Sequence, residues 1–415
     1  MLVGCNATSI RISKVVVAEV SPECPTCKRV STKPAATRAR ILYDLRLDRF
    51  SIRRWVVKYI YQTYYCWRCQ LIFGLEKRFR TKLKFGWNLV AYFVYQVIEL
   101  CIPQRIVTQS INRLFGFNLI CNTTNQFKSR AAAFYRDTYQ QILSRLAGGD
   151  LVHADETRAN VKGQAAYVWV FTNLREVAYL YADTREAEVL QATLAGFKGV
   201  LVSDFYAAYD SLDCPQQKCL SHLLRDLNDE ILEHPYDEAM KQLAGTFAAL
   251  VKPMVETVDR WGLKRHFLRK HLVFVDRFYR ALAKGVYQSE AAAKWKERFE
   301  KNRNKLFTFL NYDGIPWNNN NAEHAIKAYA ALRTVMGGTS TRAGIEEYLI
   351  LLSICETCEY QGLDFLEFLR SGEKDIETFA RSRGRKRGVG PSSSVEQSSR
   401  CSFSIGQEDA CHLLA

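Results

Sequence analysis

Short runs rich in β-branched and aromatic residues open the middle of the chain. Residues 151–157, 167–173 and 176–183 read LVHADET, YVWVFTN and EVAYLYAD, and turn residues separate them. Runs of this length and spacing predict an antiparallel meander. A fourth run, GVLVSDF at 199–205, has the continuous apolar character of a buried strand, and KCLSH at 218–222 is a candidate fifth strand. We expect these strands to belong to one mixed sheet.

Apolar residues at three- and four-residue spacing predict helices around this sheet. The longest such stretch lies between the last predicted strand and a run of four asparagines, and it is rich in Lys and Arg. The predicted helices cover residues 185–196, a segment from Leu223, almost all of 237–310, a segment from about Ala322, and residues 346–362. The fold class expected is therefore mixed α/β or α+β with a helical insertion.

The character of the sequence changes several times along the chain, and these changes divide it into parts. We predict an N-terminal extension at 1–20, a cysteine-containing module at 21–85, a helical region at 86–148, a mixed α/β region at 149–380 and a tail at 381–415. The tail is basic and then Ser-rich, with little apolar content until its end, and this composition predicts disorder. Its basic run could contact phosphates or simply be solvated.

Composition narrows the classes of partner and compartment. The formal net charge is +15, from 58 Lys and Arg against 43 Asp and Glu, which favours a polyanion such as nucleic acid. No run reaches the roughly 18 apolar residues that span a bilayer, and no secretory signal is recognisable. With 13 cysteines, a reducing cytoplasmic setting fits best, and no membrane role is expected.

Two CxxC pairs predict a structural metal site. Cys24 and Cys27 form the first pair, Cys66 and Cys69 form the second, and 38 residues separate the pairs. Four thiolates suit a closed tetrahedral Zn²⁺ site. A redox dithiol is the alternative, although a single pair would suffice for it. A third CxxC, Cys355 to Cys358, lies in an apolar helical run and is expected to contribute buried thiols.

Three acidic residues occupy positions where carboxylates can meet. Asp155 ends the first strand run, Asp204 ends the fourth, and Glu323 begins a helix. Clustered carboxylates repel one another unless cations neutralise them, and two Mg²⁺ or Mn²⁺ ions would do so. An Asp after a strand can equally be a turn or cap residue. Other acids compete for the same role: Glu156, Asp183, Asp210, Asp213 and Asp226.

The helical region at 86–148 contains a candidate helix–turn–helix. Helices are predicted at 88–100 and from Gln104 to Gly116, with Pro103 in the turn. The second helix carries side chains of the types that contact bases and phosphates: Arg105, Gln109 and Arg113. A helical packing module is an equally open interpretation. Likewise, the alternation of Arg and Lys with Trp and Tyr at 49–68 indicates either a nucleic-acid face or a sheet with basic residues outside.

Several of these motifs, in this order, resemble transposases of the insertion sequence 66 family. The motifs are LVHADET, GVLVSDFYAAYD, CLSHLLRDL, DGIPWNNNNAEHAIK and GLDFLEFL, and the resemblance runs from about residue 20 to 370. It implies a ribonuclease-H-like catalytic domain of the DDE type, with Asp155, Asp204 and Glu323 as the metal-binding triad. It also implies that residues 237–310 are an insertion before the last acid and that a zinc module precedes the catalytic domain.

The resemblance also assigns supporting residues. A Cys-x-x-His element of the family corresponds to Cys219 and His222, followed by Arg225, and paired asparagines correspond to Asn319 and Asn320. His222 could orient a phosphate or move a proton, or it could be a packed histidine. Asparagine side chains can cap the first turn of the helix that carries Glu323.

Two positions near the last acid differ from the family pattern. Family members often have Asp at position 318 and Arg at position 324, where this chain has Asn and His. The resemblance therefore assigns no role to a basic residue directly after the Glu. Lys327, one turn later, could contact DNA or form a surface ion pair.

The predicted function is thus a DNA transposase that cuts and joins strands by metal-dependent phosphoryl transfer. Its partners would be double-stranded DNA at transposon ends and targets, further copies of the chain, and possible element-encoded helper proteins. Two alternatives remain open. One is an inactive or repurposed DNA-binding derivative, and the other is a ribonuclease-H-like nuclease without strand transfer.

Overall fold

The computed structural model describes residues 11–31, 33–74, 84–161, 163–287, 289–336 and 341–384. The chain divides into two compact units, residues 1–131 with 366–372 and residues 132–365 with 373–415. Each unit is described by itself. Residues 1–10 of the predicted extension and residues 385–415 of the predicted tail lie outside the described residues.

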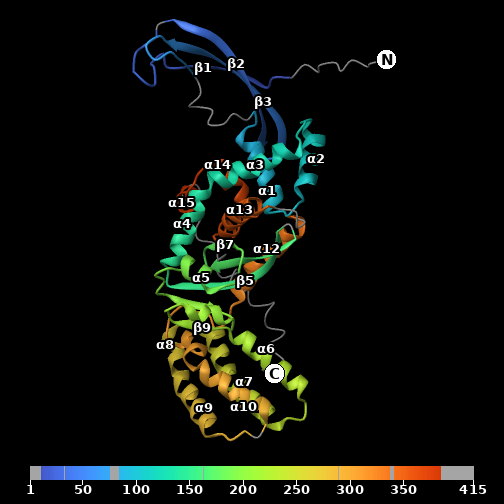
Figure 1. Ribbon diagram of the computed structural model, residues 1–415, viewed down its shortest axis with the longest axis vertical. Helices are drawn as coiled ribbons and strands as arrows, with labels where there is room; N and C mark the ends of the chain where they lie inside the picture. The colour runs from blue at the N-terminus through green and yellow to red at the C-terminus, as the bar shows by residue number, and fades with distance from the viewer. Residues whose placement is uncertain are drawn as a thin grey trace, which may run out of the picture. The chain divides into compact units, whose positions relative to one another are not determined.

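A long β-hairpin dominates the first unit. Strands β2 (Pro34–Asp48) and β3 (Ser51–Cys66) pair antiparallel over almost their whole length, as the blue ribbon in Figure 1 shows. Strand β1 (Lys14–Ala18) lies parallel to β3, and β4 (Leu71–Phe73) turns back onto its end. The aromatic and basic alternation at 49–68 therefore belongs to a sheet strand.

The helices of the first unit follow the predicted pattern. Helix α1 covers Trp87–Ile98 and helix α2 covers Gln104–Phe115, with Pro103 at the start of α2. Gly116 ends α2 with a φ of +63°, a conformation that glycine adopts without strain. Helix α3 (Cys121–Phe134) begins in this unit, and most of α14 (Phe365–Ser371) belongs to it.

A five-stranded mixed sheet forms the centre of the second unit. Its order is β7-β6-β5-β8-β9, and the strands are β5 (Leu151–Val161), β6 (Gln164–Thr172), β7 (Val177–Ala182), β8 (Val200–Ser203) and β9 (Gln216–Lys218). Strands β5, β6 and β7 form the predicted antiparallel meander, and β8 and β9 run parallel to β5. The mixed sheet expected from the sequence is confirmed.

The segment KCLSH differs from the prediction. Strand β9 ends at Lys218, and helix α6 (Leu220–Glu233) begins three residues before the predicted Leu223. Its start is fixed by a distant segment, because the Leu220 N–H donates to the Trp317 carbonyl at 3.0 Å. Consequently Cys219 and His222 lie at the beginning of a helix and not in a strand.

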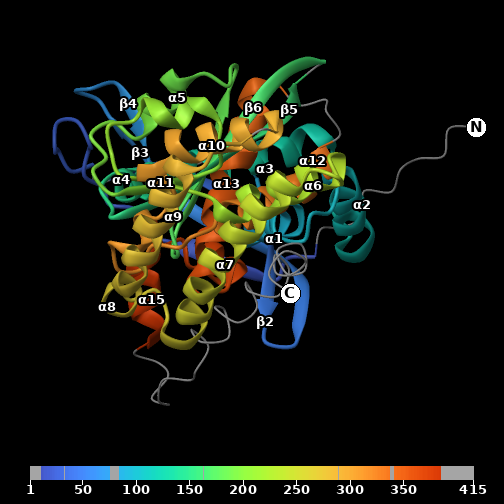
Figure 2. The ribbon, with the colours of Figure 1, turned by 90° about the horizontal axis from the view of Figure 1, so that it is seen from below.

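Helices make up the rest of the second unit, and they confirm the helical character predicted for 237–310. Helices α7 and α9 run side by side in both ribbon views (Figures 1 and 2). The α-helices are α4 (Arg136–Ala147), α5 (Ala187–Thr193), α7 (Glu238–Trp261), α8 (Arg265–Leu268), α9 (Leu272–Lys284), α10 (Glu290–Lys301), α11 (Arg303–Leu306), α12 (Asn320–Met336), α13 (Arg342–Tyr360) and α15 (Ile376–Gly384). Short 3₁₀ helices cover Ala207–Ser211 (η2), Arg269–His271 (η3) and Thr308–Leu310 (η4).

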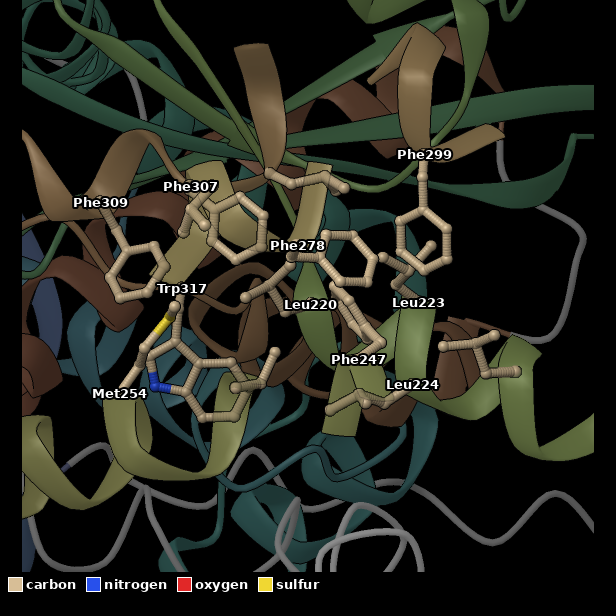
Figure 3. Packing of buried hydrophobic residues seen from close by; sticks show 14 of the residues in the cluster. Leu220, Leu223, Leu224, Phe247, Met254, Phe278, Phe299, Phe307, Phe309 and Trp317 are labelled. Carbon is tan, nitrogen blue, oxygen red and sulfur yellow. The ribbon is translucent and has the colours of Figure 1, made fainter. Parts of the chain in front are cut away.

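An aromatic core joins the helical insertion to the sheet. Phe247 of α7 lies with its ring centroid 4.7 Å from that of Phe299 and 5.8 Å from that of Phe278. Figure 3 shows these rings together with leucines of α6 and with Trp317. Burying such side chains is worth about 1.5–3 kcal/mol each. This core therefore anchors both the start of α6 and the segment that leads into α12.

Two further observations bear on predictions made above. Cys355 and Cys358 are buried in α13, as expected. None of the described helices combines the length and the apolar character that crossing a membrane requires.

Candidate metal and nucleic-acid sites

Neighbouring strands bring the first two predicted acids to the same edge of the sheet. His153 of β5 pairs in parallel register with Val202 of β8. Asp155 and Asp204 each follow this pair by two residues. Asp155 lies within β5 and Asp204 directly follows β8, so the register brings the two residues to the same level of the sheet. The carboxyl ends of parallel strands are the usual location of ligand sites in such sheets.

A buried asparagine brings the third acid to this edge. Asn319 precedes α12, and its amide Nδ2 donates to the Ala154 carbonyl at 3.0 Å. Its Oδ1 lies 3.0 Å from Nδ1 of His153. The Glu323 N–H donates to the Asn319 carbonyl at 3.2 Å, which begins the helix. The first turn of α12 is thus attached to β5 directly beside Asp155.

The other asparagines of the run have different partners. Asn318 Oδ1 accepts the N–H of Asn320 at 3.4 Å, so Asn318 supplies the side-chain bond at the helix start. Asn321 Nδ2 donates to the Asn173 carbonyl at 2.7 Å. The predicted capping role therefore falls to Asn318, while the side chain of Asn319 turns toward the sheet.

The three predicted acids share a property that the competing acids lack. Within the described residues, no Lys or Arg forms an ion pair with Asp155, Asp204 or Glu323. The competing acids all have cationic partners, namely Arg185 for Glu156, Arg342 for Asp183, Lys218 and Lys305 for Asp210, Lys198 for Asp213 and Arg298 for Asp226. Three carboxylates without a side-chain cation leave an excess of negative charge that a metal ion would neutralise.

Burial and neighbouring negative charges both raise the pKa of Asp155. Burial raises the pKa of Asp155 to about 7, although the Glu156 N–H donates to its Oδ1 at 2.8 Å. The charges of Glu156, Asp204 and Glu323 raise this pKa further. A divalent cation beside Asp155 would stabilise the ionised form of this carboxyl group.

Glu156, directly after Asp155, has a structural environment. Its side chain is 1% exposed and accepts hydrogen bonds from Arg185 Nε, at 2.6 Å, and from the Tyr209 hydroxyl. Because successive residues of a strand point to opposite faces, Glu156 points away from the face of Asp155. The sequence already indicates this difference, because Asp155 and Glu156 are neighbours in one strand and must lie on opposite faces of the sheet.

A second potential metal cluster adjoins the first. Ligand atoms of Cys219, His222 and Glu323 all lie within 4.8 Å of one another. Cys219 is buried, and its Sγ accepts the N–H of Asn319 at 3.2 Å. The structure thus brings together the predicted supporting residues Cys219, His222 and Asn319, whereas Arg225 and Lys327 are exposed on α6 and α12.

The two CxxC pairs converge in the first unit. Sulfur atoms of Cys24, Cys27, Cys66 and Cys69 all lie within 4.8 Å of one another, and Cys27 Sγ is 3.5 Å from Cys66 Sγ. Tetrahedral Zn–S bonds of about 2.3 Å place sulfurs about 3.8 Å apart. The residues after each pair, Lys28 and Gln70, both adopt positive φ. The two pairs therefore have the same local turn, and the cluster could bind zinc.

Two surfaces carry exposed cations. On α2, Arg105, Gln109 and Arg113 are exposed, and their four-residue spacing places them on one face of the helix. In the second unit, a groove beside Asp204 is lined by Phe205, Ala207, Asp210, Lys294, Glu297, Arg298, Lys301 and Asn302. The groove also holds Asp210 and Glu297, and Lys294 and Arg298 pair with Glu290 and Asp226, so Lys301 is the lining cation without an ion pair among the described residues.

Sequence reasoning did not identify His153 and Lys218 as part of the site. His153 lies on the same side of β5 as Asp155, two residues before it, and holds Asn319. The sequence could have indicated this, because His153 lies two residues before Asp155 and residues at this spacing share one face of a strand. Lys218 is buried and lies 3.1 Å from Asp210 and 3.2 Å from the Ser203 hydroxyl. No local pattern marks a buried lysine.

Comparison with known proteins identifies the family. The sequence model of the transposase IS66 family matches residues 82–347, which is more than half of the chain. The chain is also similar to the uncharacterized protein y4qI of Sinorhizobium fredii (strain NBRC 101917 / NGR234), with 24% identity over 274 residues. This match covers 55% of the chain and 48% of the relative, so the chain spans about half the length of that curated protein.

Proposed function

Because this chain belongs to the transposase IS66 family, we propose that it cuts DNA at transposon ends and joins the freed ends to target DNA by a DDE mechanism. One observation carries the proposal. The register of β5 with β8 supports placing Asp204 at the level of Asp155, and the Asn319 bond to Ala154 supports placing the start of α12, which carries Glu323, beside them. The charges of Asp204 and Glu323 also raise the pKa of Asp155. The order β7-β6-β5-β8-β9 supports assignment to the ribonuclease-H-like fold.

In this proposal the three carboxylates hold Mg²⁺ or Mn²⁺. Oxygen ligands suit these ions. Two such ions would supply Lewis-acid chemistry, activating the attacking oxygen and stabilising the leaving oxygen of a phosphodiester. The protein's own part is to fix the acids in place. Asn319 does so for α12, and the parallel pairing of β5 with β8 does so for Asp155 and Asp204.

The basic surfaces would hold the DNA. The groove beside Asp204 contains Lys294, Arg298 and Lys301, and in this proposal it holds the DNA strand next to the carboxylates. In the first unit, the exposed face of α2 would contact DNA, and a zinc ion bound by the four cysteines would stabilise the sheet that carries them. Assembly of several copies on paired ends, with possible helper proteins, is an expectation from the family resemblance.

The proposal is tested by cleavage and joining of DNA. A plasmid that carries the ends of the encoding element is incubated with the full chain and Mg²⁺. We expect Asp155→Asn, Asp204→Asn and Glu323→Gln each to lower the rate by at least about a thousandfold, since each removes a charge that acts on the transition state. Asp213→Asn is the matched control, because Asp213 is exposed and its nearest cation, Lys198, is 3.9 Å away.

The results separate the proposal from its alternatives. Cleavage that survives Glu323→Gln unchanged would refute the DDE assignment. Binding without cleavage, by both the unchanged chain and the variants, would favour a DNA-binding protein derived from a transposase. Cleavage without joining would favour a ribonuclease-H-like nuclease.

A further inference from the structure

Two polar atoms beside the carboxylate edge face each other without a hydrogen bond. His222 Nδ1 and Glu323 Oε1 lie 3.6 Å apart. Both atoms are buried, and neither has a hydrogen-bond partner in the part of the chain that the structure describes. Leaving buried polar atoms unsatisfied costs about 1–3 kcal/mol each. The third member of the cluster, Cys219 Sγ, lies within 4.8 Å of both side chains' ligand atoms.

We propose that Cys219, His222 and Glu323 form a binding site for a thiophilic divalent cation of the Zn²⁺ class, and that this ion competes with Mg²⁺ for Glu323. Thiolate, imidazole and carboxylate are all zinc ligands, whereas Mg²⁺ takes oxygen ligands. Three protein ligands with a fourth position open distinguish this site from the closed set of four cysteines in the first unit. The competition rests on the proposed function, but the ion site itself does not.

The distances agree with a single bound ion. Zn–N and Zn–O bonds of about 2.0–2.2 Å in a tetrahedral arrangement place the nitrogen and oxygen ligands about 3.4 Å apart. The observed separation of His222 Nδ1 from Glu323 Oε1 is 3.6 Å. Small side-chain rotations would therefore suffice to complete the site. A direct hydrogen bond between the two side chains would bring the atoms closer, to roughly 2.7–2.9 Å.

The ligands are carried by segments that the fold locks together. Cys219 and His222 stand three residues apart at the start of α6, so they lie on the same turn. The Leu220 N–H donates to the Trp317 carbonyl at 3.0 Å, and the Asn319 N–H donates to Cys219 Sγ at 3.2 Å. These bonds fix the start of α6 against the segment that leads into α12. Glu323 lies in the first turn of α12. The three ligands therefore converge without a rearrangement of the backbone.

The site is tested with Co²⁺, which reports thiolate and tetrahedral ligands by its absorption spectrum. The full chain, loaded with one Zn²⁺ per chain so that the four-cysteine cluster is filled and the three-ligand site is left open, is titrated with Co²⁺ and compared with Cys219→Ser and His222→Ala. We expect one added Co²⁺ per chain with a thiolate-to-cobalt band. Both variants should bind it at least about tenfold more weakly, since even the loss of an outer partner of a ligand costs 10–100-fold. The Cys219→Ser variant should lack the band.

Matched variants keep this result interpretable. Cys214→Ser removes a thiol that belongs to neither cluster and should bind Co²⁺ like the unchanged chain. His222 is partly exposed, so His222→Ala provides a test even where Cys219→Ser lowers stability. Unchanged stoichiometry and spectrum in both Cys219→Ser and His222→Ala would overturn the site.

The competition is tested separately. Added Zn²⁺ should inhibit Mg²⁺-dependent cleavage by the unchanged chain, and His222→Ala should require at least about tenfold more Zn²⁺ for the same fractional inhibition. Equal sensitivity of the two proteins would refute the competition. Should Co²⁺ bind as expected while Glu323→Gln still cleaves DNA, the ion site stands and the DDE assignment fails. If Glu323→Gln abolishes cleavage but Co²⁺ binding is unchanged in Cys219→Ser and His222→Ala, the DDE assignment stands and the ion site fails.

Discussion

Asn319 Oδ1 lies 3.0 Å from His153 Nδ1, although 166 residues separate the two in sequence. The Nδ2 of the same amide donates to the Ala154 carbonyl. This second bond fixes the orientation of the amide, so His153 Nδ1 must carry the proton and donate to Asn319. Both residues are fully buried. One side chain thus joins β5, which carries Asp155, to α12, which carries Glu323.

Replacing Asn319 by Ala should therefore destabilise the second unit and disable the site together. The change leaves the Ala154 carbonyl and His153 Nδ1 buried without their partner, and we expect a loss of about 1–3 kcal/mol in the free energy of unfolding. Urea denaturation measures it. Asn311→Ala is the control, because Asn311 is exposed. A stability equal to that of the control would show that these hydrogen bonds contribute nothing.

The adjacent acids Asp155 and Glu156 should respond differently to neutral substitution. In Glu156→Gln the Tyr209 hydroxyl and Arg185 lose a charged partner, so stability should fall by about 1–3 kcal/mol. Cleavage should persist, because Glu156 points away from the site. In Asp155→Asn cleavage should disappear while the fold survives. Thermal melting and DNA cleavage on the same preparations distinguish the two, and equal loss of cleavage in both would contradict the assignment of Glu156.

Removal of zinc should unfold the small sheet around the four cysteines. Structural zinc contributes an apparent binding free energy of about 10–16 kcal/mol in small domains at neutral pH, and the cluster is packed with few apolar partners beyond Phe73 and Tyr64. We expect Cys66→Ser to lose the metal and to become sensitive to proteases near β4. Metal analysis and limited proteolysis measure this, with Cys121→Ser as the control because Cys121 is exposed outside the cluster. Metal-free protein with unchanged protease resistance would contradict a structural role.

Local patterns were sufficient to predict several parts of the fold and site. The runs that form β5, β6 and β7 are short and rich in β-branched and aromatic residues, and the run that forms β8 is continuously apolar. Both patterns predict strands from the local sequence alone. Gly116 ends α2 because a residue with positive φ is needed there. Asp204 directly follows β8, as predicted, whereas the predicted position of Asp155 at a strand end was wrong, because β5 continues to Val161 through its hairpin with β6.

What the sequence could not provide depends on distant partners. The start of α6 at Leu220 is fixed by the Trp317 carbonyl, which no local pattern reveals. The same holds for the competing acids. Asp210, for example, is neutralised by Lys305, 2.8 Å away in space and far along the chain. The role of Asn319 was also hidden, because a helix-capping asparagine and one that bonds a neighbouring strand look identical in sequence.

Lys301, in the groove beside Asp204, should contribute to DNA affinity without regard to DNA sequence. Each phosphate contact that is lost should reduce the slope of log K against log salt concentration by about 0.9. We expect Lys301→Ala to weaken binding to duplexes of unrelated sequence equally and to lower this slope. Titration of labelled DNA at several salt concentrations measures both effects. Lys241→Ala, at an exposed ion pair with Glu238 outside this groove, is the control. An unchanged slope would remove Lys301 from the DNA path.

The exposed face of α2 should instead discriminate between DNA sequences, if it reads the transposon ends. Arg105 and Arg113 are two turns apart on this face, and an arginine that contacts a guanine contributes about 1–3 kcal/mol of discrimination. We expect Arg113→Ala to reduce the preference for end DNA over unrelated DNA about 5- to 150-fold, as that energy range implies. Competition binding between the two DNAs measures this preference. Arg136→Ala, on α4, supplies a matched loss of charge on another helix. A uniform loss of affinity for both DNAs would mean that α2 contacts phosphates, and no loss at all would mean that α2 is a packing helix.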